Sequence, residues 1–228
     1  MALFLNSYPL TPDPYFASVQ YLLMCNEANG STTIVDASSA SRTTTCRGNA
    51  AASTAQFKFG TSAIALDGTG DWIDIPDAAS LEPGSADLTL EGWFRRSSGG
   101  DYFSKNTPLA SDGILLQADK LYVSSTGAGW DMIDNQDIGT IPAGAWTHLA
   151  ITRIGNTWRG FVDGVKGLEV TAAGTVHNNN QRWSFGNQND GSGSGITGHI
   201  GAIRLTFGVG RYAADFEVPF EAFPTFGP

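Results

Sequence analysis

Hydrophobic and polar residues alternate along residues 145–170, and this stretch gives the clearest prediction of local structure. In AWTHLAITRI (145–154) the even-numbered positions point to one face and the odd-numbered positions to the other, as in a strand. Gly-Asn at 155–156 and Asp-Gly at 163–164 then separate the runs TWRGFV and VKGLEV. Such pairs favour two-residue hairpin turns, because these turns need positive φ. The pattern predicts a three-strand antiparallel meander.

Short runs of the same kind recur along the chain, and turn residues separate nearly all of them. The other predicted strands are Val19–Cys25, Ala63–Leu66, Trp72–Ile75, Leu88–Arg95, Ile114–Ala118, Lys120–Ser124, Arg182–Phe185 and Gly198–Phe207. One helical turn is predicted at residues 13–16, with Asp13 as N-cap and Pro14 at the first helical position. No segment sustains a 3.6-residue period. We therefore expect an all-β protein, either a sandwich or a barrel.

The composition agrees with a turn-rich β domain and excludes some partners. The 228 residues include 28 Gly and 10 Pro, and only 15% are charged, against roughly 25% in an average globular protein. A net charge of −9 leaves no basic face for nucleic acid. No apolar run approaches the length of a membrane span, and MALFLNSYPLTPDP lacks the basic start of a signal peptide. Without an export signal, Cys25 and Cys46 are expected to be free thiols.

The two ends differ from the middle, so we divide the chain into three parts. Residues 1–14 and 219–228 are rich in Pro and aromatic residues and are expected to be extended arms, whereas residues 15–218 form one domain. Two interpretations are open for these arms. They pack along their own domain, or they dock on a partner. The aromatic residues expected to make such partner contacts are Phe220, Phe223, Phe226, Tyr8 and Phe4.

The stretch LDGTGDWIDIPD (66–77) contains four aspartates and is a candidate site. It does not fit an EF-hand, because the twelfth position from Asp67 is Ala78 rather than Glu. Asp71 and Asp74 are three residues apart and thus face opposite sides of a strand, which excludes a catalytic pair from this strand alone. A pair across strands, such as Asp74 with Glu91, stays open. The favoured interpretation is a turn that leads into a strand, with Asp74 beside Trp72 on the non-aliphatic face.

The loop SFGNQNDGSGSGITG (184–198) is the other candidate for binding. It places Asn187, Asn189 and Asp190 near Trp183, and neutral amides beside aromatic rings are typical of sugar recognition. The alternative is a flexible, solvated loop without a ligand. Together with Trp72 and Asp74, these residues form the predicted ligand-binding set. The three histidines show no metal-binding spacing, and we expect no metal, no cofactor and no catalytic residue.

Four segments resemble a laminin G-like, concanavalin A-type jelly roll of the kind found in phage virion proteins. They are STAQFKFGTSAIALDGTGDWIDIPD, ADLTLEGWFR, GAWTHLAITRIGNTWRGFVDGVK and GHIGAIRLTFGVGRYAADFEVPFEAFP, and the resemblance covers roughly residues 15–224. It implies a two-sheet antiparallel β-sandwich whose first and last strands are neighbours. An opening strand of the pattern "lLl…GSTTIVDAS" belongs to the same order of elements.

The resemblance implies function less sharply, because this fold serves lectins, glycosidases and virion parts alike. The first hypothesis is a non-enzymatic capsid decoration protein, assembled in a bacterial cytoplasm and exposed on the virion surface. It would contact neighbouring virion proteins, as a homo-oligomer within the particle. The alternative is a carbohydrate-binding adhesion module that binds a glycan. A glycoside hydrolase is the third hypothesis.

Overall fold

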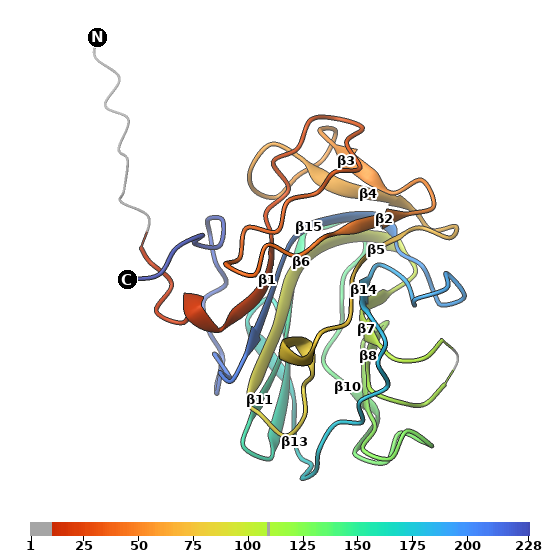
Figure 1. The fold of residues 1–228 in the computed structure, drawn as a ribbon, viewed down its shortest axis with the longest axis vertical. Coiled ribbons are helices and arrows are strands. Elements are labelled where there is room, and N and C mark those ends of the chain that lie inside the picture. The colour runs from red at the N-terminus through yellow and green to blue at the C-terminus, as the bar shows by residue number, and fades with distance from the viewer. Residues whose placement is uncertain (1–10, 109) are drawn as a thin grey trace.

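Two antiparallel sheets pack face to face in the computed structural model, which describes residues 11–108 and 110–228 (Figure 1). The predicted all-β sandwich is therefore confirmed. The predicted contact residues Phe4 and Tyr8 lie outside the described residues. No helix in the described ranges has the length and apolar character to cross a membrane.

The larger sheet has eight strands and contains the predicted meander. Its order is β13 (Val165–Thr171), β12 (Thr157–Val162), β11 (Thr147–Ile154), β6 (Leu88–Ser98), β15 (Thr197–Phe207), β4 (Ala63–Asp67) and β3 (Ala51–Ser53), and β1 (Val19–Leu23) also pairs with β15. The turns of the meander adopt the positive φ that the sequence predicted, at Gly155, Asp163 and Gly164. The pairing of β1 with β15 makes the first and last strands neighbours, as the resemblance implied.

The smaller sheet has seven strands. Its order is β10 (Ile133–Asp137), β9 (Lys120–Val123), β8 (Ile114–Gln117), β7 (Asp101–Lys105), β14 (Trp183–Phe185), β5 (Trp72–Ile75) and β2 (Thr45–Arg47). Strands β2, β3, β7 and β10 were not predicted. The opening strand implied by the resemblance is confirmed at its start by β1 but is wrong at GSTTIVDAS, since this segment makes only isolated bridges at Ile34 and Asp36.

Alternating side chains of the two sheets fill the space between them. Leu88, Leu90 and Phe94 of β6 belong to this core, as do Ile73 and Ile75 of β5. Residues between them in sequence, such as Glu91 and Asp74, therefore project from the outer faces of the two sheets. Each sheet thus has an outer face on which a site can form.

The C-terminal segment (residues 208–228) lies over the outer face of the eight-stranded sheet (Figure 1). Phe223 is 3% exposed and joins a second apolar cluster with Val19 and Trp93, so this part of the segment packs on its own domain. Phe220 is 88% exposed and is free to meet a partner. Packing on the domain is therefore confirmed for Phe223, whereas partner contact stays a prediction for Phe220 and for Phe226, which is 42% exposed.

The start of the described chain is tied to this segment. The backbone N–H of Asp13 donates to the carbonyl of Phe226 over 3.0 Å. Asp13 Oδ1 accepts from the N–H of Tyr15, and a short 3₁₀ turn, η1 (Phe16–Ser18), follows. The predicted helical turn is thus present two to three residues further along the chain than expected.

Candidate functional site

The β2–β5–β14 end of the seven-stranded sheet gathers the candidate site on its outer face. Trp72 and Asp74 are two residues apart on β5 and share this face, because Ile73 and Ile75 between and beside them point into the core. Antiparallel pairing sets Arg47 of β2 opposite Trp72 and Ser184 of β14 opposite Asp74. Arg182 lies at the start of β14. We call Arg47, Trp72, Asp74 and Arg182 the Trp72 site.

Asp74 is the buried centre of the Trp72 site, at 1% exposure. Its Oδ2 accepts hydrogen bonds from Arg47 Nε at 2.7 Å and from the indole Nε1 of Trp72 at 3.2 Å. Arg182 Nη1 donates to Oδ1 at 3.2 Å and to Oδ2 at 3.3 Å. A carboxylate with three donors is a fixed anchor, so Asp74 orients its neighbours rather than meeting solvent.

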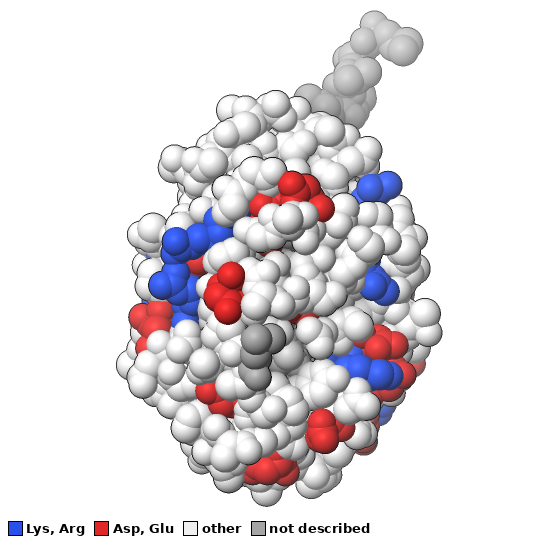
Figure 2. Space-filling view, turned by 90° about the vertical axis from the view of Figure 1, so that its right-hand side faces the viewer, with Lys and Arg blue, Asp and Glu red and all other residues white. Residues whose placement is uncertain are grey.

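The two arginines present the exposed part of the site. Their side chains are 37% exposed in Arg47 and 41% exposed in Arg182. The hydrogen bond to Asp74 raises the pKa of the Arg47 guanidinium above its ordinary value. Figure 2 shows the molecule from this side, where one group of basic side chains lies on the left and others are spread over the right among scattered acidic ones. The arrangement offers fixed N–H donors beside an aromatic ring.

The predicted loop meets the Trp72 site at Asn189, Asp190 and Gly191. Asn189 Nδ2 donates to the backbone carbonyl of Arg182 and thereby holds that end of β14. Gly191 has φ +76° and lies so close to Trp72 that a Cβ there would come within 2.9 Å of the indole ring. Asp190 is exposed and accepts the N–H of Ser192 over 2.8 Å. The structure therefore brings three predicted residues together, Trp72, Asp74 and Asn189, while Asp190 beside Gly191 binds Ser192 rather than a residue of the site.

Two other predicted residues are not placed to touch a ligand. Trp183 is fully buried in the core on the opposite face of β14, where its Nε1 donates to the carbonyl of Leu81 at 3.0 Å. Asn187 is 1% exposed, because its Oδ1 accepts the N–H of Gln188 and its carbonyl accepts the hydroxyl of Ser184. The expectation of an exposed amide cluster is wrong at these positions. The polar groups of Asn187 close the loop instead, whereas the indole N–H of Trp183 binds Leu81 outside the loop.

A buried carboxylate explains why this loop is ordered over the sheet. Asp101 of β7 is buried, and its Oδ2 accepts the N–H of Ser194 while its Oδ1 accepts from Gln117. The backbones of Asp101 and Ser194 also bond to each other over 3.0 Å, and Gly186 donates to the Asp101 carbonyl. Burial raises the pKa of Asp101 despite these donors. The loop is thus fastened at both ends to one residue.

The remaining aspartates of LDGTGDWIDIPD organise the chain locally. Asp71 is buried and accepts the N–H groups of Asn49 and Asp67, each at 2.8 Å. The turn adopts positive φ at Gly68 and Gly70, as predicted for a turn before a strand. Asp77 forms an ion pair with Lys105 at 2.8 Å. None of these contacts resembles a metal-binding loop, and no cluster of three His, Cys, Asp or Glu residues suited to a metal occurs among the described residues.

The sandwich separates the two carboxylates of the glycosidase hypothesis. Asp74 lies on the outer face of the seven-stranded sheet and Glu91 on the outer face of the eight-stranded sheet. Packed sheets lie about 10 Å apart, and both side chains point away from that gap, whereas paired glycosidase carboxylates are about 5–10 Å apart. Asp74 and Glu91 therefore do not form a catalytic pair.

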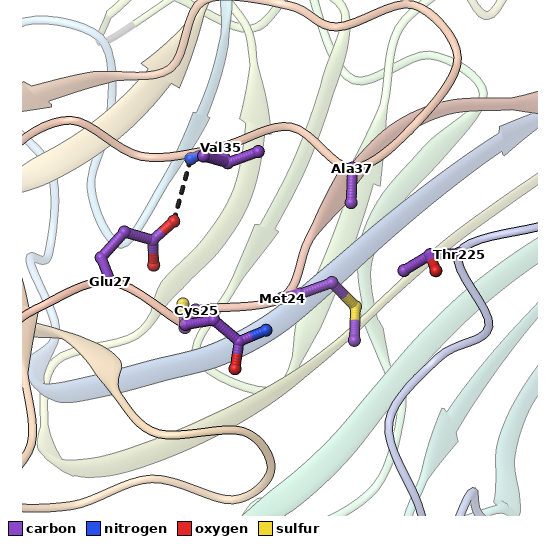
Figure 3. A pocket seen from close by; sticks show the side chains of 7 residues that line it. Met24, Cys25, Glu27, Val35, Ala37 and Thr225 are labelled. Atoms are coloured by element: carbon purple, nitrogen blue, oxygen red, sulfur yellow. Dashed lines mark hydrogen bonds between the residues drawn. The ribbon is translucent and has the colours of Figure 1, made fainter.

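A pocket of about 430 Å³ lies elsewhere, beside the end of β1 (Figure 3). Its lining residues are Met24, Cys25, Asn26, Glu27, Val35, Ala37 and Thr225. Glu27 is the one charged residue of this lining, and its Oε1 accepts the N–H of Val35 at 2.9 Å. Cys25 and Cys46 are free thiols, as expected. The lining is mainly apolar, and β1 belongs to the other sheet, so this pocket is not part of the Trp72 site.

Sequence reasoning missed Arg47 and Arg182 as members of the site. For Arg182 a signal was present, because alternation in RWSF (182–185) sends Trp183 inward and its neighbours outward. For Arg47 there was none, since β2 has three residues and its register against β5 is a long-range contact.

The family of the chain follows from comparison with known proteins. Residues 67–206 match the Laminin_G_3 family, described as the concanavalin A-like lectin/glucanases superfamily. No curated protein matches the sequence.

Similar solved structures support the fold. Domain 4 of AbnA, a GH43 extracellular arabinanase from Geobacillus stearothermophilus, in complex with arabinotriose, has a TM-score of 0.63 and 18% identity, covering 84% of this chain and 93% of that chain. The binding domain of Paraclostridial Mosquitocidal Protein 1 has a TM-score of 0.59 and 15% identity, covering 85% of this chain and 48% of that one.

A third structure, Trypanosoma rangeli sialidase in complex with sialic acid, has a TM-score of 0.55 and 12% identity, covering 92% of this chain and 32% of that one. The chain thus spans about half of the mosquitocidal binding domain (48%) and about a third of the sialidase (32%). Identities this low establish the shared fold. The chain belongs to the Laminin_G_3 family of the concanavalin A-like lectin/glucanase superfamily.

Proposed function

We propose that this protein is a non-catalytic carbohydrate-binding domain that holds a glycan at the Trp72 site. One observation carries the proposal: a partly buried tryptophan is flanked by two half-exposed guanidinium groups, and a buried carboxylate fixes all three. Sugars present apolar C–H faces and a ring of hydroxyls. An aromatic ring and fixed hydrogen-bond donors recognise these two features.

Preorganisation makes this surface suited to binding. A free arginine side chain loses about 2 kcal/mol of rotamer entropy when a ligand orders it. The ion pairs of Asp74 with Arg47 and Arg182 have already restricted both side chains before a glycan arrives. More of the contact energy is then available for affinity.

The family and the neighbouring folds support a glycan as the ligand. The chain belongs to a lectin/glucanase superfamily, and one similar domain was solved in complex with arabinotriose. Asp74 is engaged by three donors and Glu91 lies on the other sheet, which supports binding without hydrolysis.

A glycan array followed by titration calorimetry tests the proposal. The wild-type protein is expected to bind a defined set of glycans, and Trp72→Ala is expected to weaken that binding at least tenfold. Val165→Ala serves as the matched control, because Val165 is an exposed hydrophobic residue on the other sheet. Binding that is unchanged in Trp72→Ala, or absent for the wild type across the array, contradicts the proposal.

A second candidate function is a surface component of a phage virion, as the sequence resemblance implies. The exposed ring of Phe220, beside a small hollow lined by Thr11 and Pro219, supports contact with a neighbouring virion subunit. Phe220→Asp is then expected to abolish incorporation into particles while the domain stays folded. Normal incorporation of this variant would argue against a docking role for Phe220. The two functions are compatible, since a glycan-binding face can be displayed on a particle.

A further inference from the structure

We propose that the Trp72 site selects an acidic sugar, whose carboxylate binds between Arg47 and Arg182. This inference rests on the proposed carbohydrate-binding function and names the class of glycan. It is carried by the hydrogen-bond donors of the two arginines that Asp74 leaves unused.

The unused donors can be counted from the contacts. Arg47 uses Nε and Nη2 toward Asp74, at 2.7 and 3.5 Å, and Arg182 uses only Nη1. Within residues 11–108 and 110–228, no hydrogen bond involves Arg47 Nη1 or Arg182 Nε and Nη2. Both side chains are more than a third exposed, at 37% and 41%, so these N–H groups are available to a ligand. A planar carboxylate is the group that guanidinium forks bind best.

The charges of the site also favour an anion. Of the four residues of the Trp72 site, Arg47 and Arg182 are positive and Asp74 is negative, which leaves one positive charge. Asp190 in the adjoining loop is also negative, and it binds the N–H of Ser192. Asp74 is 1% exposed, whereas the guanidinium groups face solvent. A single ligand carboxylate would neutralise the remaining charge. A neutral sugar would leave it uncompensated and could not form the bidentate pair that a carboxylate makes with a guanidinium group.

Trp72 sets where the rest of the sugar lies. Its indole edge is fixed by the hydrogen bond to Asp74, and Gly191 lies close to the far part of the ring. The carboxylate between the arginines and the pyranose face against the partly exposed indole together match a uronic or sialic acid residue.

The test compares acidic glycans with neutral copies of the same shape. The probes are uronate and sialate oligosaccharides on an array, each beside its methyl ester, which keeps the ring and removes the charge. The wild-type protein is expected to bind the acid form of at least one pair ten times more strongly than the ester. Equal binding of acid and ester, or binding of neutral glycans alone, overturns the inference and leaves the proposed function standing. Binding to no glycan contradicts both.

Arginine variants assign the selectivity to the site. Arg182→Gln and Arg47→Gln are each expected to reduce binding of the acid form at least tenfold and to leave ester binding within twofold. Arg182→Lys keeps the positive charge but loses the planar guanidinium fork. Its binding of the acid form is expected to lie between that of the wild type and that of Arg182→Gln. Lys166→Gln is the matched control, because it removes one positive charge from β13 on the other sheet. Acid binding that survives in both glutamine variants overturns the inference.

A folding control is needed because Asp74 is buried. Removing one arginine leaves this carboxylate with fewer partners, which can destabilise the domain. The double variant Asp74→Asn/Arg182→Gln removes both charges of a pair and keeps the amide hydrogen bond available. If this variant melts like the wild type and still prefers acid over ester tenfold, the inference is overturned. If it stays folded and loses the preference, the inference is supported.

Discussion

Arg204 and Glu91 are cross-strand partners in the middle of the eight-stranded sheet, and Arg204 Nη2 lies 2.8 Å from Glu91 Oε1. Both side chains are almost fully buried, at 6% and 0% exposure. Tyr212 of the C-terminal segment donates to the other carboxylate oxygen at 2.9 Å, and Asp13 pairs with the far side of Arg204 at 3.0 Å. This buried network joins the sheet to both ends of the described chain.

The first prediction is that acid weakens the fold through Glu91. Burial alone would raise the pKa of Glu91, but the charge of Arg204 and the contact with His148 lower it from 4.5 to about 2. Unfolded chains take up the proton near pH 4.5, so the stabilisation is complete above that pH and is lost as the pH falls to about 2. Its size is on the order of 3 kcal/mol. Urea unfolding at pH 7 and at pH 3 measures the loss.

Glu91→Gln is the control for this prediction. The variant leaves Arg204 buried without its carboxylate partner and is expected to lose about 3–5 kcal/mol of unfolding free energy at pH 7. Its stability should then fall less than that of the wild type between pH 7 and pH 3. An equal fall in both proteins would show that other groups govern acid unfolding.

The second prediction separates the phenylalanines of the C-terminal segment. Phe223 is 3% exposed and packs 4.2 Å from the guanidinium of Arg204, so Phe223→Ala should lower the unfolding free energy by about 3 kcal/mol or detach the segment. Phe220 is 88% exposed, and Phe220→Ala should change the unfolding free energy by less than about 0.5 kcal/mol. Chemical denaturation and limited proteolysis measure both. Equal effects would contradict the packing described for this segment.

The third prediction separates two tryptophans that the sequence grouped as ligand-binding. Trp72→Ala should abolish glycan binding with little change in melting temperature, because Trp72 lies on the outer face. Trp183→Phe should leave binding intact but lower stability by about 1–3 kcal/mol, because the carbonyl of Leu81 loses its buried donor. Calorimetric titration and thermal melting report the two effects. If Trp183→Phe lost binding and Trp72→Ala kept it, the ligand would bind on the face of β14 that carries Trp183.

The fourth prediction concerns the free thiols. Burial, with a contribution from the charge of Glu27, raises the pKa of Cys46 to about 11, and burial raises the pKa of Cys25 well above the ordinary range. Thiolate is the reactive form, so neither cysteine should react quickly with a disulfide reagent at pH 8. Both should react at once in denaturant. A fast-reacting thiol in the folded protein would show that Cys46 is more open than described.

Local patterns predicted the parts of the fold that depend on neighbouring residues. The meander of β11, β12 and β13 was predictable because its turns at 155–156 and 163–164 carry residues that tolerate positive φ. Strands β2 and β3 have three residues each and contain no alternation long enough to detect. Their existence depends on partners that lie elsewhere in the sequence.

In the candidate site, too, local spacing was predictable and long-range contacts were not. The shared face of Trp72 and Asp74 followed from a spacing of two, whereas Arg182 reaches Asp74 from 108 positions away in sequence. The network of Asp13 with Arg204 joins positions 191 apart. The amides at 187–189 resembled a sugar-binding cluster because composition cannot distinguish a hydrogen-bond donor used to close a loop from one left free for a ligand.

The hydrogen bond between the backbones of Asp13 and Phe226 holds the two ends of the described chain close together. The chain enters and leaves on the side of the eight-stranded sheet, while the Trp72 site is on the opposite side of the sandwich (Figure 1). Any anchor attached at either end, whether another polypeptide segment or a larger assembly, would therefore sit behind the domain. The face that carries the Trp72 site would point away from such an attachment.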